Sequence, residues 1–573
     1  MLKRLSILVA IISIVACDPQ DEFINQNAAT QDTTTDSVNV NNDANVIINP
    51  WKVKADVENE LLGAYKALRQ NCVTRMAVWG EMRSDNIVEG EGASDDISNI
   101  CRENLLPSNE FCKYDAFYDV VNRANKVLLF APQVAALDPD YHMSEFYSHQ
   151  AEAIALRSIC YWYLIRTFRD VPYITNYDES GNLSSNTPQS TFESILDSLI
   201  TDLENIRNNV FLRYATKEES VSRFTRLSIN ALLADMYLWR GNADDYDKCI
   251  ELSQSITSDK LKDYMMLRDE QGDSCTIKFF NGYPLISNSS ANNIGNSYNE
   301  IFGRGSSFES LFEFLYSDTK NPYVPNYYMK NQTNPGQIKA LSWIGDDFSS
   351  STGNRVFEQP QDTRLYQNVW QFDDYTWEIC KYVYDDLRLK VDYGRIEPKS
   401  ASFRNQKEAS WIVYRYSEVL LFEAEAYLMK AMQLPDGDSL CIEYKDKALS
   451  LIDAVNKRSI VADNETVIPE TLASIGYSAN TNADELKTLL YNERRRELMF
   501  EGKRWFDLVR ITLSEGNHGC LSRCLEMKFD AADIVAIKIK FSNPYGLFFP
   551  ISEEEIEKSN GVLKQNPAYS VDQ

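Results

Sequence analysis

Residues 492–510 read NERRRELMFEGKRWFDLVR, a stretch that combines dense charge with bulky apolar side chains. Glu493, Glu497 and Glu501 are spaced four residues apart, so a helix places the three carboxylates in one stripe. Three consecutive arginines flank that stripe, and Trp505 supplies part of the apolar surface. A helix of this composition cannot leave all its bulky side chains in water, so we expect some of its charges to be buried and paired.

Two neighbouring carboxylates also form the acid and the nucleophile of glycoside hydrolases, which gives this stretch a second interpretation. A catalytic acid needs a raised pKa, whereas adjacent arginines hold carboxylates ionised. We therefore favour a structural role. The 84 acidic residues of the chain still leave a surface glycoside hydrolase open as an alternative of another class.

Other catalytic motifs are absent from the sequence. It contains neither G-x-S-x-G nor H-E-x-x-H, and no G-x-x-x-x-G-K phosphate loop. Its three histidines, at 142, 149 and 518, lie near no convincing nucleophile. Asp436–Asp438 and Asp346–Asp347 offer oxygen ligands without the order of an EF-hand, so we expect solvated loops there. We predict no enzyme activity, no cofactor and no metal site.

The overall composition is that of a globular protein with a strongly acidic balance. Of the 573 residues, 44% are hydrophobic and 25% are charged, and the formal net charge is −26. Such a charge opposes binding to nucleic acid, so we expect no nucleic-acid partner. Eleven cysteines allow disulfides outside the cytoplasm, but their spacing alone determines no pairing.

The first residues have the pattern of a secretory signal. Lys3 and Arg4 precede an apolar stretch that ends at Cys17 and is too short for a comfortable membrane span. The tetrapeptide IVAC that ends there resembles a bacterial lipobox, so we expect residues 1–16 to be a signal peptide and Cys17 to be lipidated. Residues 17–50 then carry the lipid and form a disordered polar tether, because they contain few large apolar side chains.

Hydrophobic periodicity divides the rest of the chain into three parts. Residues 51–259 repeat apolar side chains every three or four positions, which predicts an N-terminal helical-repeat part. Residues 260–409 lose that period and are rich in Gly, Asn, Tyr, Phe and Trp, which predicts an irregular, aromatic-rich region on the ligand side. The helical period returns over residues 410–573, which we expect to complete the scaffold.

Two helical hairpins are recognisable in this pattern. The first spans residues 231–256 with a turn at Gly241, and the second spans residues 424–452 with a loop through Pro435 and Gly437. Small residues at the crossing let antiparallel helices approach closely, as in tetratricopeptide repeats. We predict a mostly α fold: a tetratricopeptide-like helical-repeat scaffold with a large irregular, loop-rich insertion containing a few short strands.

Local signals predict several helix boundaries. Ser190 with Glu193, and Ser552 with Glu555, are typical capping boxes at helix starts. An earlier helix should end before Pro172, because proline disfavours helix at the residue before it.

Five blocks follow one another along the chain: residues 151–172, 415–426, 492–510, 550–551 and 565–569. Behind the lipobox, these blocks resemble the SusD/RagB family of outer-membrane nutrient-binding lipoproteins. The resemblance implies a lipid-anchored protein that faces the cell exterior and delivers its ligand to a SusC-like TonB-dependent transporter. The implied ligand is an oligosaccharide, as in starch or polysaccharide utilisation, and a peptide-binding RagB-like member is the alternative.

Two regions are expected to hold the ligand. The resemblance places one after residues 81–85, and it offers Arg83, Asp85 and Asn86. The other is the aromatic-rich region, where sugars would stack on exposed rings near amides and carboxylates. From it we choose Tyr298, Tyr327, Trp343, Tyr375 and Trp377. Trp343 and Trp377 are the first choices for exposure, because they stand in loop-like contexts with neighbouring aspartates.

Overall fold

The computed structural model describes residues 49–181, 183–290, 293–316, 321, 323–330, 335–345, 356–357, 359, 361–371, 377–392, 395–404, 409–461 and 471–570. The predicted signal peptide, Cys17, nearly all of the tether, Tyr375 and Asp346–Asp347 lie outside these described residues. The folded unit begins at Trp51.

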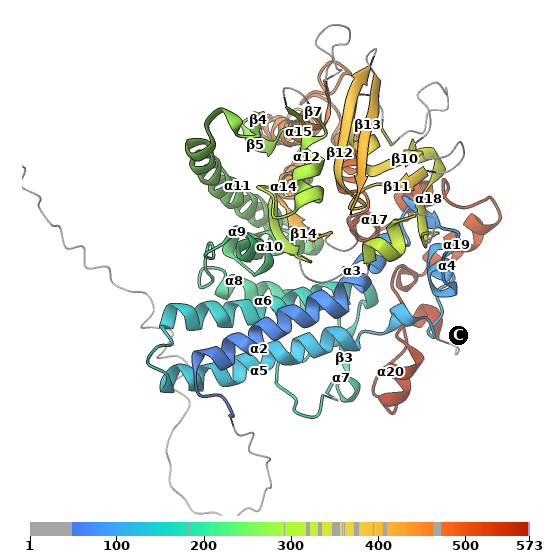
Figure 1. The fold of residues 1–573 in the computed structure, drawn as a ribbon. Helices are drawn as coiled ribbons and strands as arrows, with labels where there is room; N and C mark the ends of the chain where they lie inside the picture. The colour runs from blue at the N-terminus through green and yellow to red at the C-terminus, as the bar shows by residue number, and fades with distance from the viewer. Residues whose placement is uncertain are drawn as a thin grey trace, which may run out of the picture. The chain divides into compact units, whose positions relative to one another are not determined.

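Three long helices pack side by side in the N-terminal part (Figure 1). They are α2 (Lys54–Ala67), α5 (Asp115–Leu137) and α6 (Met143–Phe168). α2 continues through a π-helical turn, η1 (Leu68–Cys72), into α3 (Val73–Glu81), which carries the chain toward the centre of the molecule.

The predicted hairpins are present and stack on each other. α10 (Arg226–Arg240) and α11 (Ala243–Gln271) meet at Gly241, whose positive φ of 69° permits the tight turn. α14 (Tyr416–Ala431) and α15 (Ser439–Ser459) form the second hairpin, and α14 also packs on α11. The predicted helical-repeat scaffold is therefore confirmed, although α11 runs past the expected boundary at residue 259.

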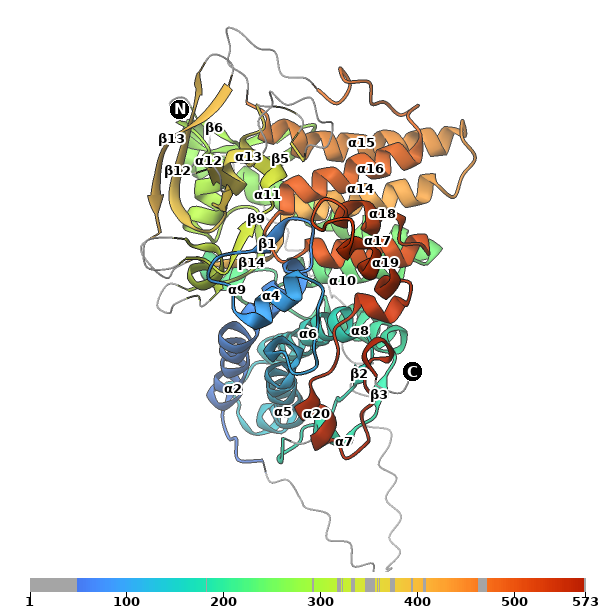
Figure 2. The same ribbon diagram turned by 90° about the vertical axis from the view of Figure 1, so that its right-hand side faces the viewer.

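The other described α-helices lie between residues 95 and 558. They are α4 (Asp95–Cys101), α7 (Leu183–Asn186), α8 (Phe192–Ile206), α9 (Lys217–Ser222), α12 (Asn296–Tyr298), α13 (Thr363–Asn368), α16 (Ala483–Leu498), α17 (Arg504–Glu515), α18 (Gly519–Leu525), α19 (Asp533–Phe541) and α20 (Glu553–Lys558). α16 lies against α14 and α15 (Figure 2).

Two of the three predicted boundaries are confirmed. α6 ends at Phe168, before Pro172, and α20 begins directly after Ser552, whose hydroxyl accepts a hydrogen bond from the Glu555 amide at 3.3 Å. The third is wrong by one residue: Thr191, not Ser190, caps α8. Ser190 is held instead in a short antiparallel pair with residue 171.

The strands are short and form small antiparallel sheets. The largest sheet has the order β13-β12-β7-β6, and the others are two-stranded pairs: β1–β9, β2–β3, β4–β5, β8–β14 and β10–β11. Their bounds are β1 (Ile87–Glu89), β2 (Val171–Pro172), β3 (Gln189–Ser190), β4 (Ile277–Phe280), β5 (Tyr283–Ile286), β6 (Ser289–Ser290), β7 (Asn293–Ile294), β8 (Ser310–Phe314), β9 (Ile338–Ala340), β10 (Val369–Gln371), β11 (Trp377–Ile379), β12 (Tyr384–Asp392), β13 (Arg395–Phe403) and β14 (Trp411–Arg415).

The β1–β9 pair joins the two regions expected to hold the ligand. Ile87 of the loop after α3 pairs with Ala340 of the aromatic-rich region. β9 in turn contacts β11, which begins at Trp377. Segments more than 200 residues apart in sequence therefore meet at one edge.

α3 touches the turn after α16 through two glycines. A Cβ atom on Gly80 would lie 1.7 Å from the carbonyl oxygen of Gly502, so only glycine fits at position 80. Gly502 itself has a positive φ of 70°.

No helix among the described residues is long and apolar enough to cross a membrane. The ten cysteines of the described ranges are all free, and seven of them are buried. None of these ten cysteines therefore forms a disulfide in this structure.

Candidate functional site

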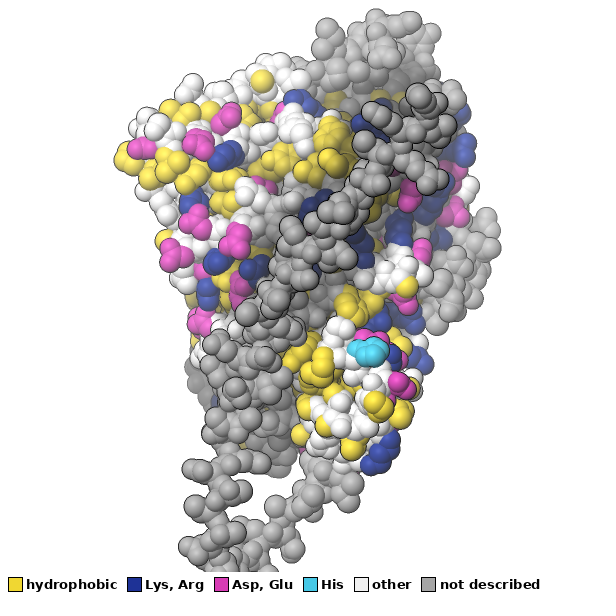
Figure 3. Space-filling model, turned by 90° about the vertical axis from the view of Figure 1, so that its left-hand side faces the viewer, with side chains coloured by type: hydrophobic (Ala, Val, Ile, Leu, Met, Phe, Trp, Pro, Cys, Tyr) yellow, Lys and Arg dark blue, Asp and Glu magenta, His cyan; other side chains and the backbone are white. Residues whose placement is uncertain are grey.

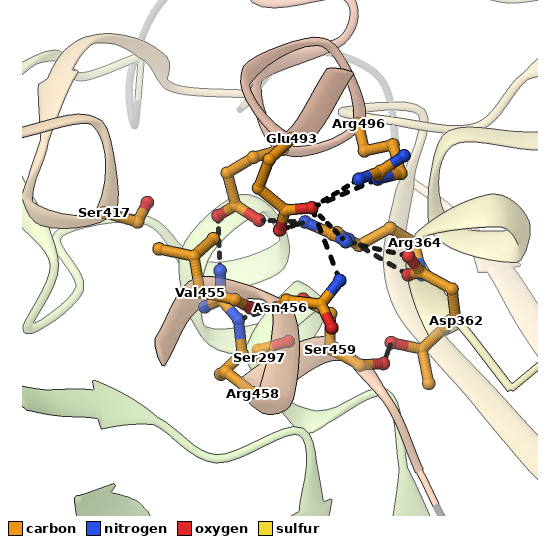
Figure 4. A network of polar contacts seen from close by, with 12 residues as sticks. Ser297, Asp362, Arg364, Ser417, Val455, Asn456, Arg458, Ser459, Glu493 and Arg496 are labelled. Atoms are coloured by element: carbon orange, nitrogen blue, oxygen red, sulfur yellow. Dashed lines mark hydrogen bonds and ion pairs between the residues drawn. The ribbon is translucent and has the colours of Figure 1, made fainter. Parts of the chain in front are cut away.

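The stretch 492–510 lies at the centre of a buried charge network (Figure 4). Arg415 donates to Glu497 at 2.6 Å and to Glu501 at 2.9 Å, and Arg364 donates to Glu493 at 2.7 Å. We call the following residues the charge network: Glu309, Asp362, Arg364, Lys381, Arg415, Arg458, Glu493, Arg496, Glu497 and Glu501. It ties the irregular region to the helical scaffold, since Arg364 comes from α13 and Arg458 from α15.

Electrostatics settle how these carboxylates behave. Burial alone would raise the pKa of Glu497, but the guanidinium groups of Arg458 and Arg415 help to hold it well below its usual range. The pKa values of Glu493 and Glu501 are lowered by neighbouring cations in the same way. Such carboxylates do not donate protons at neutral pH, so they do not supply a general acid. The expectation of buried, paired charges is confirmed.

Arg83 is fully buried at the exit of α3. Its guanidinium donates to both carboxylate oxygens of Glu103, at 2.7 and 2.8 Å, and to the carbonyl oxygens of Gly546 and Leu547. It also lies 4.0 Å from the centre of the Trp505 ring. Arg83 thus fastens the loop after α3 to the C-terminal segment and exposes no surface to a ligand.

Asp85 and Asn86 are buried in the same junction. Arg495 and Arg504 each lie 2.9 Å from a carboxylate oxygen of Asp85 and, against the effect of burial, keep its pKa below the usual range. Asn86 accepts a hydrogen bond from Arg495 at 2.8 Å and donates to Glu81 at 3.0 Å. Both residues position the loop, and neither faces solvent in this structure.

Tyr298 and Tyr327 are also inside the protein. Tyr298 is 1% exposed, and its hydroxyl donates to the carbonyl oxygen of Cys380 at 2.8 Å. Tyr327 is 8% exposed and stacks on Tyr323, with ring centres 4.9 Å apart. Their rings belong to the core of the aromatic-rich region.

The two tryptophans stand beside the β1–β9 edge. Trp343 lies in a short 3-10 helix, η6 (Ser342–Gly345), directly after β9. Trp377 opens β11 and pairs through its backbone with Gln371 of β10. Next to this edge, Lys330 forms an ion pair with Glu378 at 3.1 Å.

A cavity of about 690 Å³ opens where the loop after α3 meets the C-terminal helices. β1, α4 and α19 lie on the face turned to the viewer in Figure 2. The lining residues are Val88, Glu89, Cys101, Arg102, Glu103, Asn104, Lys528, Phe529, Asp530, Asp533, Ala536, Ile537 and Lys540. We call it the α4–α19 cavity, and we call the cavity together with β1, β9, η6, β10 and β11 the ligand-side surface.

Two lysines line the cavity together with carboxylates of Glu103, Asp530 and Asp533. Lys528 donates to the carbonyl oxygens of Met82 at 3.2 Å and Ser84 at 2.9 Å, and within the described ranges no carboxylate forms an ion pair with it. Lys540 donates to Glu103, to the carbonyl oxygen at 2.8 Å and to the carboxylate at 3.1 Å. Burial lowers the pKa of both lysines, that of Lys540 to about 8.

The other lining groups suit a hydroxyl-rich ligand. The partly buried ring of Phe529 stands beside carboxylates at the rim, Asp530 and Asp533, and near the amide of Asn104. An aromatic face with donors and acceptors around it can bind both the apolar and the hydroxyl-bearing sides of a sugar ring. Cys101 supplies no nucleophile, because burial raises the pKa of its thiol to about 11.

Sequence reasoning found only one wall of this cavity. The loop after residue 85 was expected to face the ligand, and it contributes Glu89 and Asn104. The opposite wall, from Lys528 to Lys540, was missed because it lies more than 400 residues farther along the chain. The available signal was Lys528-Phe529-Asp530, an aromatic residue between charges.

Two family models match the chain. One is described as the SusD family and matches residues 316–569; the other is described as "Starch-binding associating with outer membrane" and matches residues 32–238. SusD-like protein P38 of Formosa agariphila is 25% identical over 472 residues, which are 80% of this chain and 84% of the relative.

Solved structures show the same fold. A SusD superfamily protein from Bacteroides vulgatus aligns with a TM-score of 0.63 at 18% identity and covers 90% of this chain and 99% of its own. Surface glycan-binding protein A from Bacteroides uniformis aligns with a TM-score of 0.60 at 19% identity, covering 90% of this chain and all of that one. A laminarin-binding SusD-like protein aligns with a TM-score of 0.54 at 19% identity, covering 91% of this chain and all of that one. With both parts of its sequence matched and its fold shared, the chain belongs to the SusD family of outer-membrane-associated binding proteins.

Proposed function

We propose that this chain is a surface-exposed, lipid-anchored protein that binds an oligosaccharide and delivers it to a SusC-like TonB-dependent transporter. The ligand-side surface carries the proposal, because it joins an open cavity of about 690 Å³ to an edge that holds two tryptophans. Two structural relatives support this ligand class by their names, since one is called a laminarin-binding SusD-like protein and the other a surface glycan-binding protein.

The predicted residues divide into two roles in this proposal. Trp343, Tyr375 and Trp377 contact the ligand. Arg83, Asp85 and Asn86 hold the loop that forms one wall of the cavity, as their buried ion pairs and hydrogen bonds support. Tyr298 and Tyr327 support the aromatic-rich region from within.

Calorimetry on a panel of oligosaccharides tests the ligand and the site together. Trp343→Ala and Trp377→Ala should each weaken binding about tenfold, which is the value of one lost stacking contact. Phe279→Ala is the matched control, because this ring is 46% exposed on β4, outside the ligand-side surface. Unchanged affinity in both tryptophan variants would remove the assignment of the tryptophans.

Two further experiments test the anchor and the partner. A Cys17→Ser variant should lose its attachment to membranes, since several acyl chains supply stable anchoring. Affinity purification of the tagged chain from solubilised outer membranes should recover a TonB-dependent transporter. Firm attachment of the serine variant contradicts the anchor.

A peptide ligand is the second candidate within the family. The net charge of −26 and the aspartates at the cavity rim favour it for basic peptides. Binding of a basic peptide library without binding to any glycan would select this alternative. New reducing ends after incubation with polysaccharide would instead select the glycoside hydrolase.

A further inference from the structure

A second cavity lies away from the ligand-side surface. Its volume is about 430 Å³, and its lining includes residues of α9, the C-terminal part of α11 and the segment before β8. In Figure 1, α9 and α11 stand on the opposite side of the molecule from α4, α18 and α19. The two cavities share no lining residue.

The walls of this second cavity are apolar in part, through Leu227, Met266, Leu267, Phe308 and Leu311. Charged side chains, Asp263 and Glu270 among them, also line it. Figure 3 views the side of the molecule that carries α11 and β4, where hydrophobic side chains gather in patches among charged ones. A volume of this size is in the range that holds a small organic molecule, about 300–1,000 Å³.

Lys260 is the unusual group in that lining. It is 5% exposed, and its Nζ donates to the carbonyl oxygen of Phe308 at 2.5 Å. No carboxylate among the described residues forms an ion pair with it. Two carboxylates whose charge acts on Lys260 form ion pairs with other cations: Glu309 with Arg458 at 3.0 Å and Asp259 with Lys262 at 2.8 Å.

Charge and burial decide the form of this amine. Burial lowers the pKa of Lys260 to about 7, and Arg213 and Lys217 act in the same direction, while Glu309 and Asp259 oppose it. An ordinary lysine, with a pKa near 10.4, is almost entirely protonated at neutral pH. A buried amine without an ion pair is therefore a nucleophile where other lysines are not.

We propose that Lys260 captures small carbonyl compounds, aldehydes or ketones with an apolar chain, as reversible imines in the cavity between α9, α11 and β8. The Nζ lone pair attacks the carbonyl carbon, a proton moves from nitrogen to oxygen, and the carbinolamine loses water to give the imine. Hydrolysis reverses each step, so no oxidant or reductant is consumed. The apolar walls hold the chain of the carbonyl compound.

Reductive trapping tests the proposal on the intact chain. The protein is incubated with butanal and cyanoborohydride at pH 7, and each lysine is assayed by peptide mass spectrometry. Lys260 should be labelled about tenfold more than Lys262, a 65% exposed lysine of the same helix, because only a neutral amine attacks. Labelling of Lys260 should rise through pH 7 and level off above it.

Matched variants and probes complete the test. Lys260→Arg should abolish the preferred label, whereas Lys262→Arg should leave it unchanged. Butanal should be trapped faster than glyceraldehyde, whose chain is polar. Labelling of Lys260 at or below the level of Lys262 in the unmodified protein overturns the proposal, and this comparison holds even if the arginine variant misfolds.

Discussion

The charge network and the α4–α19 cavity contain the same residue types, yet they differ in how completely the charges are paired. In the network, Arg364, Arg415 and Arg458 each contact at least one glutamate. In the cavity, Lys528 donates hydrogen bonds to backbone carbonyl oxygens and lies 5.5 Å from the centre of the Phe529 ring, and it forms no ion pair with a carboxylate of the described residues. A densely paired, buried cluster has little capacity left for a ligand, whereas a less completely paired wall beside an open volume retains it.

How completely its charges are paired therefore distinguishes a structural region from a binding region better than its amino-acid composition does. The most charged stretch of the sequence, 492–510, is internal, and the proposed site lies where charges are fewer. Substitutions of buried, paired charges should therefore change stability, and substitutions of unpaired groups that line the cavity should change affinity.

The largest effect should come from Glu497→Gln. The change leaves Arg364, Arg415 and Arg458 buried with one carboxylate fewer. We expect the free energy of unfolding in urea to fall by about 4 kcal/mol, as for a broken buried pair. Glu557→Gln, an exposed position on α20, is the control and should be neutral. If Glu497→Gln and Glu557→Gln both had small, equal effects, the charge network would not be a main source of stability.

The next effect depends on pH and concerns Glu103, a paired carboxylate that lines the cavity. Burial would raise the pKa of Glu103, but Arg83 and Lys540 lower it to about 2. A depressed pKa contributes stability that is present above the unfolded value near 4.5 and is lost as pH falls toward 2. Between pH 5 and pH 2, the free energy of unfolding in urea should therefore fall by about 3 kcal/mol less in Glu103→Gln than in the unmodified protein. Identical pH profiles for the two proteins would show that this pair is not stabilising.

Phe529→Ala should change binding with little change in stability. The ring lines the cavity and is only partly buried. Calorimetry should show glycan affinity about tenfold weaker, while the free energy of unfolding changes by less than about 1 kcal/mol. A large loss of stability with unchanged affinity would place this ring in the core instead.

The smallest effect should be that of Arg102→Ala. Its partner is Glu89, and the side chains of the pair are 66% and 30% exposed. Exposed pairs contribute about 0.5 kcal/mol or less, so thermal unfolding should be unchanged within error. A loss of stability as large as that expected for Glu497→Gln would show that the exposure of an ion pair does not determine how much it stabilises the fold.

The sequence predicted the helical scaffold well, because helix periodicity is local. Local sequence alone identifies Gly241 as the turn between α10 and α11. It likewise identifies Ser552 as the residue that caps the start of α20. The shift at Ser190 shows the limit, since a strand partner from residue 171 decides it.

The candidate site was harder to predict, because burial of a polar loop depends on distant partners. Arg83, Asp85 and Asn86 are typical of an exposed binding loop until Glu103, Arg495 and Arg504 are placed around them. Tyr298 and Tyr327 likewise have the composition of a sugar platform, but neighbouring carbonyl groups and rings enclose them. Sequence alone does not separate a core aromatic from one at the rim.

The contact between Gly80 and Gly502 limits where the polypeptide can be split into two fragments. The two glycines touch closely enough to exclude a methyl group, and they come from the separately matched parts of the chain. In either fragment alone, water would replace this backbone contact, and the packing that it provides would be lost. We therefore expect that a chain severed within the irregular region yields soluble material only when both fragments are co-expressed.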